Sequence, residues 1–301
     1  MPLAAPVIEL SIEPGTLPRD VARAVKNAGV YVPPAWLHTW FRVSGQARLI
    51  KAGSYELEAG ITPRGLLDKL ARGDQAQGVV SLIEGWTFRQ WRAALAKEAD
   101  LRQDSASLSD EALMAALGRP DQPPEGRFYP DTYTYSKGSS DIAVLRRALR
   151  AMDQRLQAAW AQRTPQAMVR SPDEALTLAS IIEKETGRGA DRPLISAVFN
   201  NRLRINMPLQ TDPTVIYGMG ATFNGNLRRV DLQTDTPWNT YTRRGMPPTP
   251  IAMPGKAALL AAVQPASSPA LYFVARGDGS SQFSQTLEEH NRAVNTYQRR
   301  Q

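Results

Sequence analysis

Alternating apolar and polar residues, followed by helical periodicity, occur three times in the N-terminal third of the chain. In the first occurrence Ile8, Leu10 and Ile12 alternate with polar residues before a helical pattern begins. The three segments span residues 7–28, 53–71 and 78–95. Period-two alternation predicts a half-buried strand, whereas apolar residues three and four positions apart predict an amphipathic helix. We therefore expect a small α+β module here, with helices capped by Thr16, Thr62 and Thr87.

The middle of the chain has a different pattern. Residues 99–124 combine a short predicted helix, Asp110 to Leu117, with ends rich in Pro, Gly and Gln. This composition is typical of a connector or an insertion and not of a domain. Residues 141–162 carry an apolar stripe at helical spacing and predict a long helix.

A further helix is predicted from Ser171 onward. Ser171 is a good N-cap, Pro172 suits the first helical position, and Glu174 stands three residues past the cap, as in a capping box. Gly187 is the expected stop. The next helix is expected from Asp191 to Ile205.

The helix that begins after Ser171 places a carboxylate on its apolar side. Leu176, Ala179, Ile182 and Glu183 fall close to one face. A carboxyl group at the edge of a core loses hydration, so its pKa rises and it can donate a proton near neutral pH. A lone Glu near a helix end is more often solvated or salt-bridged, so this helix alone does not decide the function. Glu185 points elsewhere on the helix and is expected either at the surface or in support of the site residues, and not as a partner acid.

The loops after these helices are rich in hydrogen-bonding side chains. Residues 207–220 and 237–255 have little regular periodicity, and the second loop holds four prolines between residues 247 and 254. Proline makes such a loop stiff. Stiff loops with aromatic, amide and carboxyl side chains suit a sugar-binding groove, because aromatic faces cover sugar rings and polar groups bind hydroxyls. Ordinary ordered loops remain the alternative interpretation.

Composition excludes several classes of function. The chain has 301 residues, 42% of them hydrophobic, which is normal for a protein that buries a core. It has no cysteine and two histidines without metal-ligand spacing, so we expect no metal and no cofactor. The net charge of +7 comes with no nucleic-acid motif. We expect no nucleic-acid partner, and the charge suits an acidic substrate near an anionic bilayer.

The sequence contains no apolar run long enough for a transmembrane helix and no signal peptide.

Several motifs together resemble a known family, the endolytic murein transglycosylases (the MltG or YceG-like family). The resemblance covers residues 75–297 well and the N-terminal part more loosely. The motifs lie around Glu183 and in residues 125–133, 199–203, 209–220, 239–241, 247–255 and 272–275. Their length, order and spacing make the resemblance specific.

The resemblance implies an α+β fold in two parts. Residues 1–76 resemble a LysM-like module, and residues 77–301 resemble a YceG-like catalytic domain with its catalytic Glu on a helix. A LysM-like module implies either carbohydrate binding or a packing role, and both interpretations stay open.

The family implies a lyase that cuts peptidoglycan glycan strands internally, at the β-1,4 bond between N-acetylmuramic acid and N-acetylglucosamine, and leaves 1,6-anhydro ends. Glu183 would protonate the glycosidic oxygen and then accept the proton of the C6 hydroxyl as that oxygen attacks C1. An intramolecular nucleophile has a high effective concentration, so one acid can suffice where ordinary glycosidases use two carboxylates.

Matching positions imply a substrate-binding set beside Glu183. It consists of Gln210, Thr211, Asp212, Tyr217, Asn239, Thr240, Tyr241, Glu288 and Asn291. Asn239 and Tyr241 are the better candidates for direct contacts, and a turn role for Asp212 is at least as favoured as a substrate contact. Ser281 stands where relatives often carry His, so the resemblance assigns no proton-transfer role to that loop.

Two other functions stay open. One is a hydrolytic muramidase, with water as acceptor and Asp212 or Glu288 as base. The other is a non-catalytic glycan-binding scaffold of the wall-synthesis machinery. The resemblance also implies peptidoglycan synthases as partners, and anchoring by one helix in the inner membrane with the catalytic domain in the periplasm. Because such a helix is absent from this sequence, the resemblance leads us to expect a longer natural protein.

Overall fold

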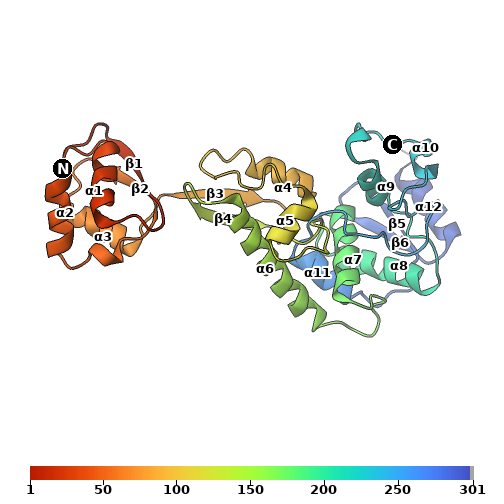
Figure 1. Ribbon diagram of the computed structural model, residues 1–301. Helices are drawn as coiled ribbons and strands as arrows, with labels where there is room; N and C mark the ends of the chain where they lie inside the picture. Colours follow the sequence, from red (N-terminus) through yellow and green to blue (C-terminus); the bar gives the residue numbers. More distant parts are fainter. Residues whose placement is uncertain (299–301) are drawn as a thin grey trace. The chain divides into compact units, whose positions relative to one another are not determined.

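The computed structural model describes residues 1–298 and shows a mixed α+β fold (Figure 1). Within these residues there are twelve α-helices and three two-stranded sheets, which confirms the predicted class. The chain forms two compact units. The first comprises residues 1–81, 94–107 and 132–144, and the second comprises residues 82–93, 108–131 and the chain from Leu145 onward. The division at residues 76 and 77 stays a prediction.

The first unit is built on an antiparallel pair of strands. Ile8, Leu10 and Ile12 are the buried positions of β1, which pairs with β2 so that Val7 lies opposite Glu58. Strand β2, three helices and the segment between the first two helices supply the rest of its core (Figure 1). Its elements are β1 (Val7–Ile12), α1 (Pro18–Asn27), α2 (Pro34–Val43), the 3₁₀ turn η1 (Ala47–Leu49), β2 (Gly53–Glu58) and α3 (Pro63–Arg72).

Of the two helix caps predicted in this unit, Thr62 and Thr16, only Thr62 forms. Thr62 accepts a hydrogen bond from the N–H of Gly65 and caps α3, as predicted. The prediction for Thr16 is wrong, because its hydroxyl donates to the carbonyl of Glu13 and the N-cap of α1 is Leu17. A Pro at the first position of α1 already removes one unpaired N–H, so this helix depends less on a capping side chain.

The next five elements follow the predicted order of strands and helices. They are β3 (Gln77–Leu82), α4 (Phe88–Leu95), α5 (Asp110–Ala116), β4 (Asp131–Ser136) and α6 (Asp141–Trp160). β3 pairs with β4. Thr87 accepts from the N–H of Gln90 at the start of α4, as predicted. The predicted helices after residues 110 and 141 are confirmed.

The second unit has α7 at its centre. Helices α8 and α11 pack against it, and the hydrophobic core also includes Met152 and Leu156 of α6 (Figure 1). The remaining elements are α7 (Pro172–Glu185), α8 (Arg192–Arg204), α9 (Asp212–Met219), η2 (Gly220–Thr222), α10 (Arg229–Gln233), α11 (Lys256–Val263), β5 (Tyr272–Ala275), β6 (Ser281–Ser284) and α12 (Leu287–Tyr297).

The start of α7 agrees with the sequence, and its end differs. Ser171 Oγ accepts the N–H of Glu174 at 3.1 Å. The Glu174 carboxylate receives the N–H of Arg170 at 2.7 Å, so only half of the predicted capping box forms. The helix ends at Glu185, before Gly187, because Thr186 is already extended, with φ −151° and ψ 135°.

None of the helices within residues 1–298 is long and apolar enough to cross a membrane. The resemblance of the first unit to a LysM-like module stays a prediction.

Candidate active site

Glu183 lies near the C-terminal end of α7 and is almost completely enclosed. Only 4% of its side chain is exposed. Every residue from Ala175 to Glu183 is buried, so this stretch of α7 is surrounded by the core, although the sequence predicted one apolar face. The carboxyl group therefore sits where water solvates it poorly.

Two donors bind the two oxygens of this carboxyl group. Nη2 of Arg192, in the first turn of α8, lies 2.7 Å from Oε1 of Glu183. The backbone N–H of Gly255 donates to Oε2 at 2.8 Å. Gly255 is the N-cap of α11, so its N–H belongs to the positive end of that helix. Both contacts stabilise the ionised form of Glu183.

A second carboxyl group, that of Glu84, reaches the same place. Glu84 lies in the turn between β3 and α4 and is exposed. A Cβ on Gly255 would overlap an oxygen of Glu84 and would lie 3.4 Å from Oε2 of Glu183. The missing side chain at position 255 therefore lets both carboxyl groups approach this loop. Glu84 was not predicted as a site residue, because the sequence around a Glu before a turn does not show which distant residues will lie beside it.

The pKa of Glu183 reflects these opposing influences. Burial is the largest and raises the pKa. The N–H of Gly255 and the charge of Arg192 lower it, while the negative charge of Glu84 raises it. The net direction is upward, in agreement with the sequence prediction. Such a group can hold a proton for donation and can take one back as a carboxylate that already has two donors.

A second polar cluster follows the end of α7. Glu185 is half-buried and accepts a hydrogen bond from the hydroxyl of Thr211, which agrees with the second of its two predicted places, in support of the site residues, and not with the surface. Tyr241 donates its hydroxyl to Oδ1 of Asp212 at 2.5 Å. Burial raises the pKa of Glu185 to about 7, and the charge of Asp212 adds to this shift. The structure thus brings three predicted site residues together around a carboxyl group that the prediction left out.

Asn239 and Thr240 are fully buried and organise the loop before the proline-rich segment. Nδ2 of Asn239 donates to the carbonyl of Thr234 at 2.7 Å, and its Oδ1 accepts the N–H of Tyr241 at 2.9 Å. Oγ1 of Thr240 accepts the N–H of Thr211 at 3.1 Å. Both side chains therefore connect this loop to itself and to the start of α9. Their contacts with a substrate stay predictions.

The remaining predicted residues are more exposed. Gln210 is exposed and has a left-handed backbone, with φ 49°. Glu288 and Asn291 are exposed on α12, which packs against β5 and β6, and Glu288 pairs with Arg292 at 3.6 Å. Their substrate roles also stay predictions.

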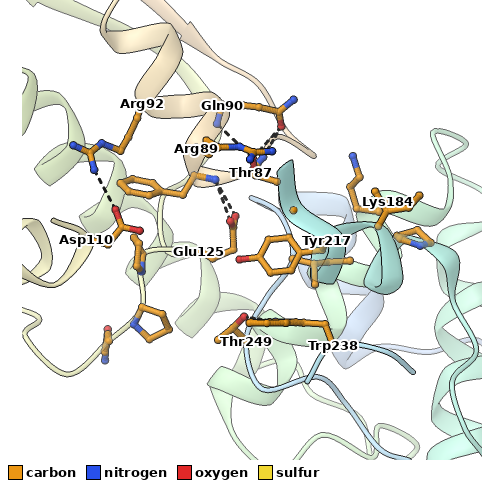
Figure 2. Close-up of a pocket in the computed structure, with 18 of the residues that line it drawn as sticks. Thr87, Arg89, Gln90, Arg92, Asp110, Glu125, Lys184, Tyr217, Trp238 and Thr249 are labelled. Atoms are coloured by element: carbon orange, nitrogen blue, oxygen red, sulfur yellow. Dashed lines mark hydrogen bonds and ion pairs between the residues drawn. The ribbon is translucent and has the colours of Figure 1, made fainter. Parts of the chain in front are cut away.

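A pocket of about 1170 Å³ opens in the second unit beside the last turn of α7 (Figure 2). Lys184, the residue after Glu183, lines it together with Tyr217 and Trp238. Glu125 lines it too, and its carboxyl group accepts the N–H of Phe88 at 3.0 Å and the hydroxyl of Tyr217. Burial raises the pKa of Glu125 to about 7. Sequence reasoning counted Glu125 as part of a motif and gave it no role.

Within residues 1–298 no group of three or more His, Asp or Glu side chains is placed to hold a metal ion. The two histidines belong to different units, His38 to the first and His290 to the second.

The profile of the YceG-like family matches residues 10–296. The chain belongs to the YceG-like family. The family resemblance predicted from the sequence is thereby confirmed. An endolytic murein transglycosylase of Bacillus subtilis (strain 168) is 31% identical to this YceG-like chain over 307 residues, which cover 96% of the chain and 84% of the relative.

Two further proteins support this membership. An endolytic murein transglycosylase of Streptococcus pneumoniae serotype 2 (strain D39) is 27% identical over 320 residues. The match covers 95% of this chain but 58% of that protein, so the chain spans little more than half of its length. The crystal structure of a YceG-like protein from Listeria monocytogenes superposes with a TM-score of 0.63 at 30% identity and covers 95% of this chain and 98% of that one.

Proposed function

We propose that this YceG-like chain is an endolytic murein transglycosylase with Glu183 as its catalytic acid and base. The observation that carries the proposal is the environment of that carboxyl group. It is buried, its pKa is raised, and Arg192 and the N–H of Gly255 bind its two oxygens. The names of the relatives supply the substrate class, murein glycan.

The proposed reaction needs one group that acts twice. Protonated Glu183 gives its proton to the glycosidic oxygen between N-acetylmuramic acid and N-acetylglucosamine, and the C1–O bond breaks. The C6 hydroxyl oxygen of the muramic acid bonds to C1, and its proton passes to the Glu183 carboxylate. The products are a free 4-hydroxyl end and a 1,6-anhydro end, and no water is consumed. Glu183 ends protonated, ready for the next cut.

Arg192 and Gly255 give the intermediate state its stability. After the first proton transfer Glu183 is a buried carboxylate, which is costly without partners. The guanidinium and the amide N–H are already in place, so the charge forms without reorganisation of the site. The tethered C6 hydroxyl has a high effective concentration, which removes the need for a second enzymic nucleophile.

The decisive experiment is mass spectrometry of the products that wild-type and Glu183→Gln protein release from un-crosslinked glycan strands. We expect anhydro ends from the wild type and no cleavage by the variant. Normal cleavage by Glu183→Gln would overturn the assignment of the acid. Glycan binding without cleavage by either protein would favour a scaffold function.

The position of Glu84 favours a second candidate, a hydrolytic muramidase. Glycosidases that hydrolyse their bond use two carboxyl groups, and Glu84 lies close enough to Glu183 to raise its pKa. In that reaction Glu84 would activate water or attack C1, and the product would carry a reducing end one water heavier than the anhydro end. The same mass spectra separate the two reactions.

We also propose that the catalytic domain works in the periplasm, attached to the inner membrane, close to the synthases that make glycan strands. The support is the location of murein outside that membrane. Accessibility of an introduced cysteine to a membrane-impermeant thiol reagent in intact spheroplasts tests this directly, because the chain has no native cysteine.

A further inference from the structure

The pocket beside α7 is lined by residues that are close neighbours of the candidate acid along the chain and in space. Lys184 Nζ donates to the carbonyl of Gly85 at 3.0 Å, and a Cβ on Gly85 would lie 3.9 Å from Cγ of Glu183. Thr249 and Ile251 line the pocket on the same proline-rich loop that presents Gly255 to Glu183. Residues that line the pocket therefore lie on the same two segments, the end of α7 and the loop before α11, that carry Glu183 and Gly255.

The pocket is large, and its lining combines aromatic, polar and charged side chains. Its volume of about 1170 Å³ exceeds the range of about 300–1,000 Å³ common for small-molecule sites. Tyr217 and Trp238 form an aromatic wall, with their ring centroids 5.5 Å apart and nearly edge to face (Figure 2). Nε1 of Trp238 donates to Thr249 at 2.9 Å, which fixes that wall.

The lining carries charges of both signs, and two of them, Arg92 and Asp110, pair with each other at 3.2 Å. Arg89 at the start of α4 is exposed, and Lys184 donates to the carbonyl of Gly85. Neither side chain forms an ion pair within residues 1–298. Glu111 and Asp121 line the side formed by α5 and the loop after it and form no ion pair with the described chain. Figure 2 shows Lys184 and Asp110 at opposite ends of the pocket.

The geometry points to a binding site for the stem peptide of murein, an inference that rests on the proposed function. This peptide hangs from the lactyl group at C3 of muramic acid, beside the bond that Glu183 would cleave. It carries carboxylates near the sugar, an amine further along, and alanine methyl groups at its end. Arg89 and Lys184 bind the carboxylates, Glu111 and Asp121 bind the amine, and the aromatic wall covers the apolar groups.

A comparison of two substrates tests the site. Glycan strands that bear peptides and strands stripped by an amidase are cleaved by wild type, Arg89→Glu and a matched control, Arg150→Glu, on the exposed side of α6. For the wild type, we expect faster cleavage of peptide-bearing strands. Arg89→Glu lowers the ratio of the two rates about tenfold, the equivalent of one lost charge-assisted contact. Arg150→Glu leaves the ratio unchanged.

Binding gives a second readout that does not depend on catalysis. In the Glu183→Gln background, isothermal titration compares the peptide-bearing disaccharide with the bare disaccharide. Tighter binding of the former, lost on addition of Arg89→Glu, supports the site. Equal binding, or equal rates on both strands, overturns it, and leaves the proposed function standing if anhydro ends are still made. Absence of cleavage together with peptide-dependent binding overturns the proposed function instead.

Discussion

At the scale of single residues, the candidate site is a balance of charges around Glu183. Arg192 and the N–H of Gly255 hold the carboxylate, whereas burial and Glu84 favour the proton. The acid must be protonated when the glycosidic bond breaks, so activity falls as the pH rises through its pKa. Each change that raises this pKa moves the alkaline limit of activity upward, and each change that lowers it moves the limit downward.

Replacement of Glu84 by Gln tests this balance. The variant loses a like charge beside Glu183, so the pKa of Glu183 falls and the alkaline limit moves to lower pH. Because Glu84 is exposed, we expect a shift of less than about one pH unit. The measurement is the pH dependence of the rate at which anhydro ends form.

Asp153→Asn, which removes the same charge on α6, is the control and should leave the profile in place. Loss of all cleavage in Glu84→Gln would contradict the prediction and would favour the muramidase, in which that carboxyl group is essential.

At the scale of elements, α7 carries the acid, and its first turn fixes where the helix begins. Ser171 caps the helix, and Pro172 fits the first position without loss of a hydrogen bond. From Ala175 to Glu183, the helix is held by packing on every side. Its end is set by Thr186, whose extended backbone turns the chain toward α8 and so brings Arg192 to Glu183.

The Ser171 cap is expected to stabilise the protein measurably. Ser171→Ala leaves the N–H of Glu174 without its acceptor and should lower the free energy of unfolding by about 1 kcal/mol. Ser171→Asp keeps an acceptor and should stay close to wild type. Urea denaturation followed by circular dichroism measures both, and equal stability of Ser171→Ala and wild type would contradict the assignment.

At the scale of the whole molecule, the second unit contains two poorly solvated carboxyl groups, that of Glu125, which is buried, and that of Glu185, which is half-buried. Burial raises the pKa of Glu125 and of Glu185 to about 7. In the unfolded chain these groups ionise near their ordinary pKa. Between the two values the unfolded state has released the proton and the folded state has kept it, so stability falls as the pH rises. Above the folded pKa the loss is complete.

Glu125→Gln should remove the part of this pH dependence of stability that comes from Glu125. The amide resembles the protonated carboxyl group and can still accept the N–H of Phe88. Relative to the variant, wild type should lose up to a few kcal/mol of unfolding free energy between pH 4.5 and 8. Unfolding midpoints of both proteins across that range provide the test. Parallel curves would show that Glu125 does not keep its proton in the folded state.

Local patterns predicted most elements of this YceG-like chain. The alternation in β1, the cap at Ser171 and the stripe of α6 depend on residues within a few positions of one another, and the structure contains all three. The predicted cap at Thr16 failed because the Thr16 hydroxyl bonds to Glu13 and α1 begins one residue later, at a proline that needs no cap for its own nitrogen. The family resemblance likewise came from short, ordered motifs.

The sequence by itself determined that a carboxyl group at position 183 would lie on a helix at the edge of a core, and in which family to look for its chemistry. Only the tertiary structure decided what surrounds that group. Glu84, Arg192 and Gly255 come from three separate segments, and no periodicity links them. The same holds for Glu125 and Glu185, whose pKa depends on burial by residues far away in the chain. Helical periodicity is a local property, whereas solvation and charge at a site are sums over everything that packs around it.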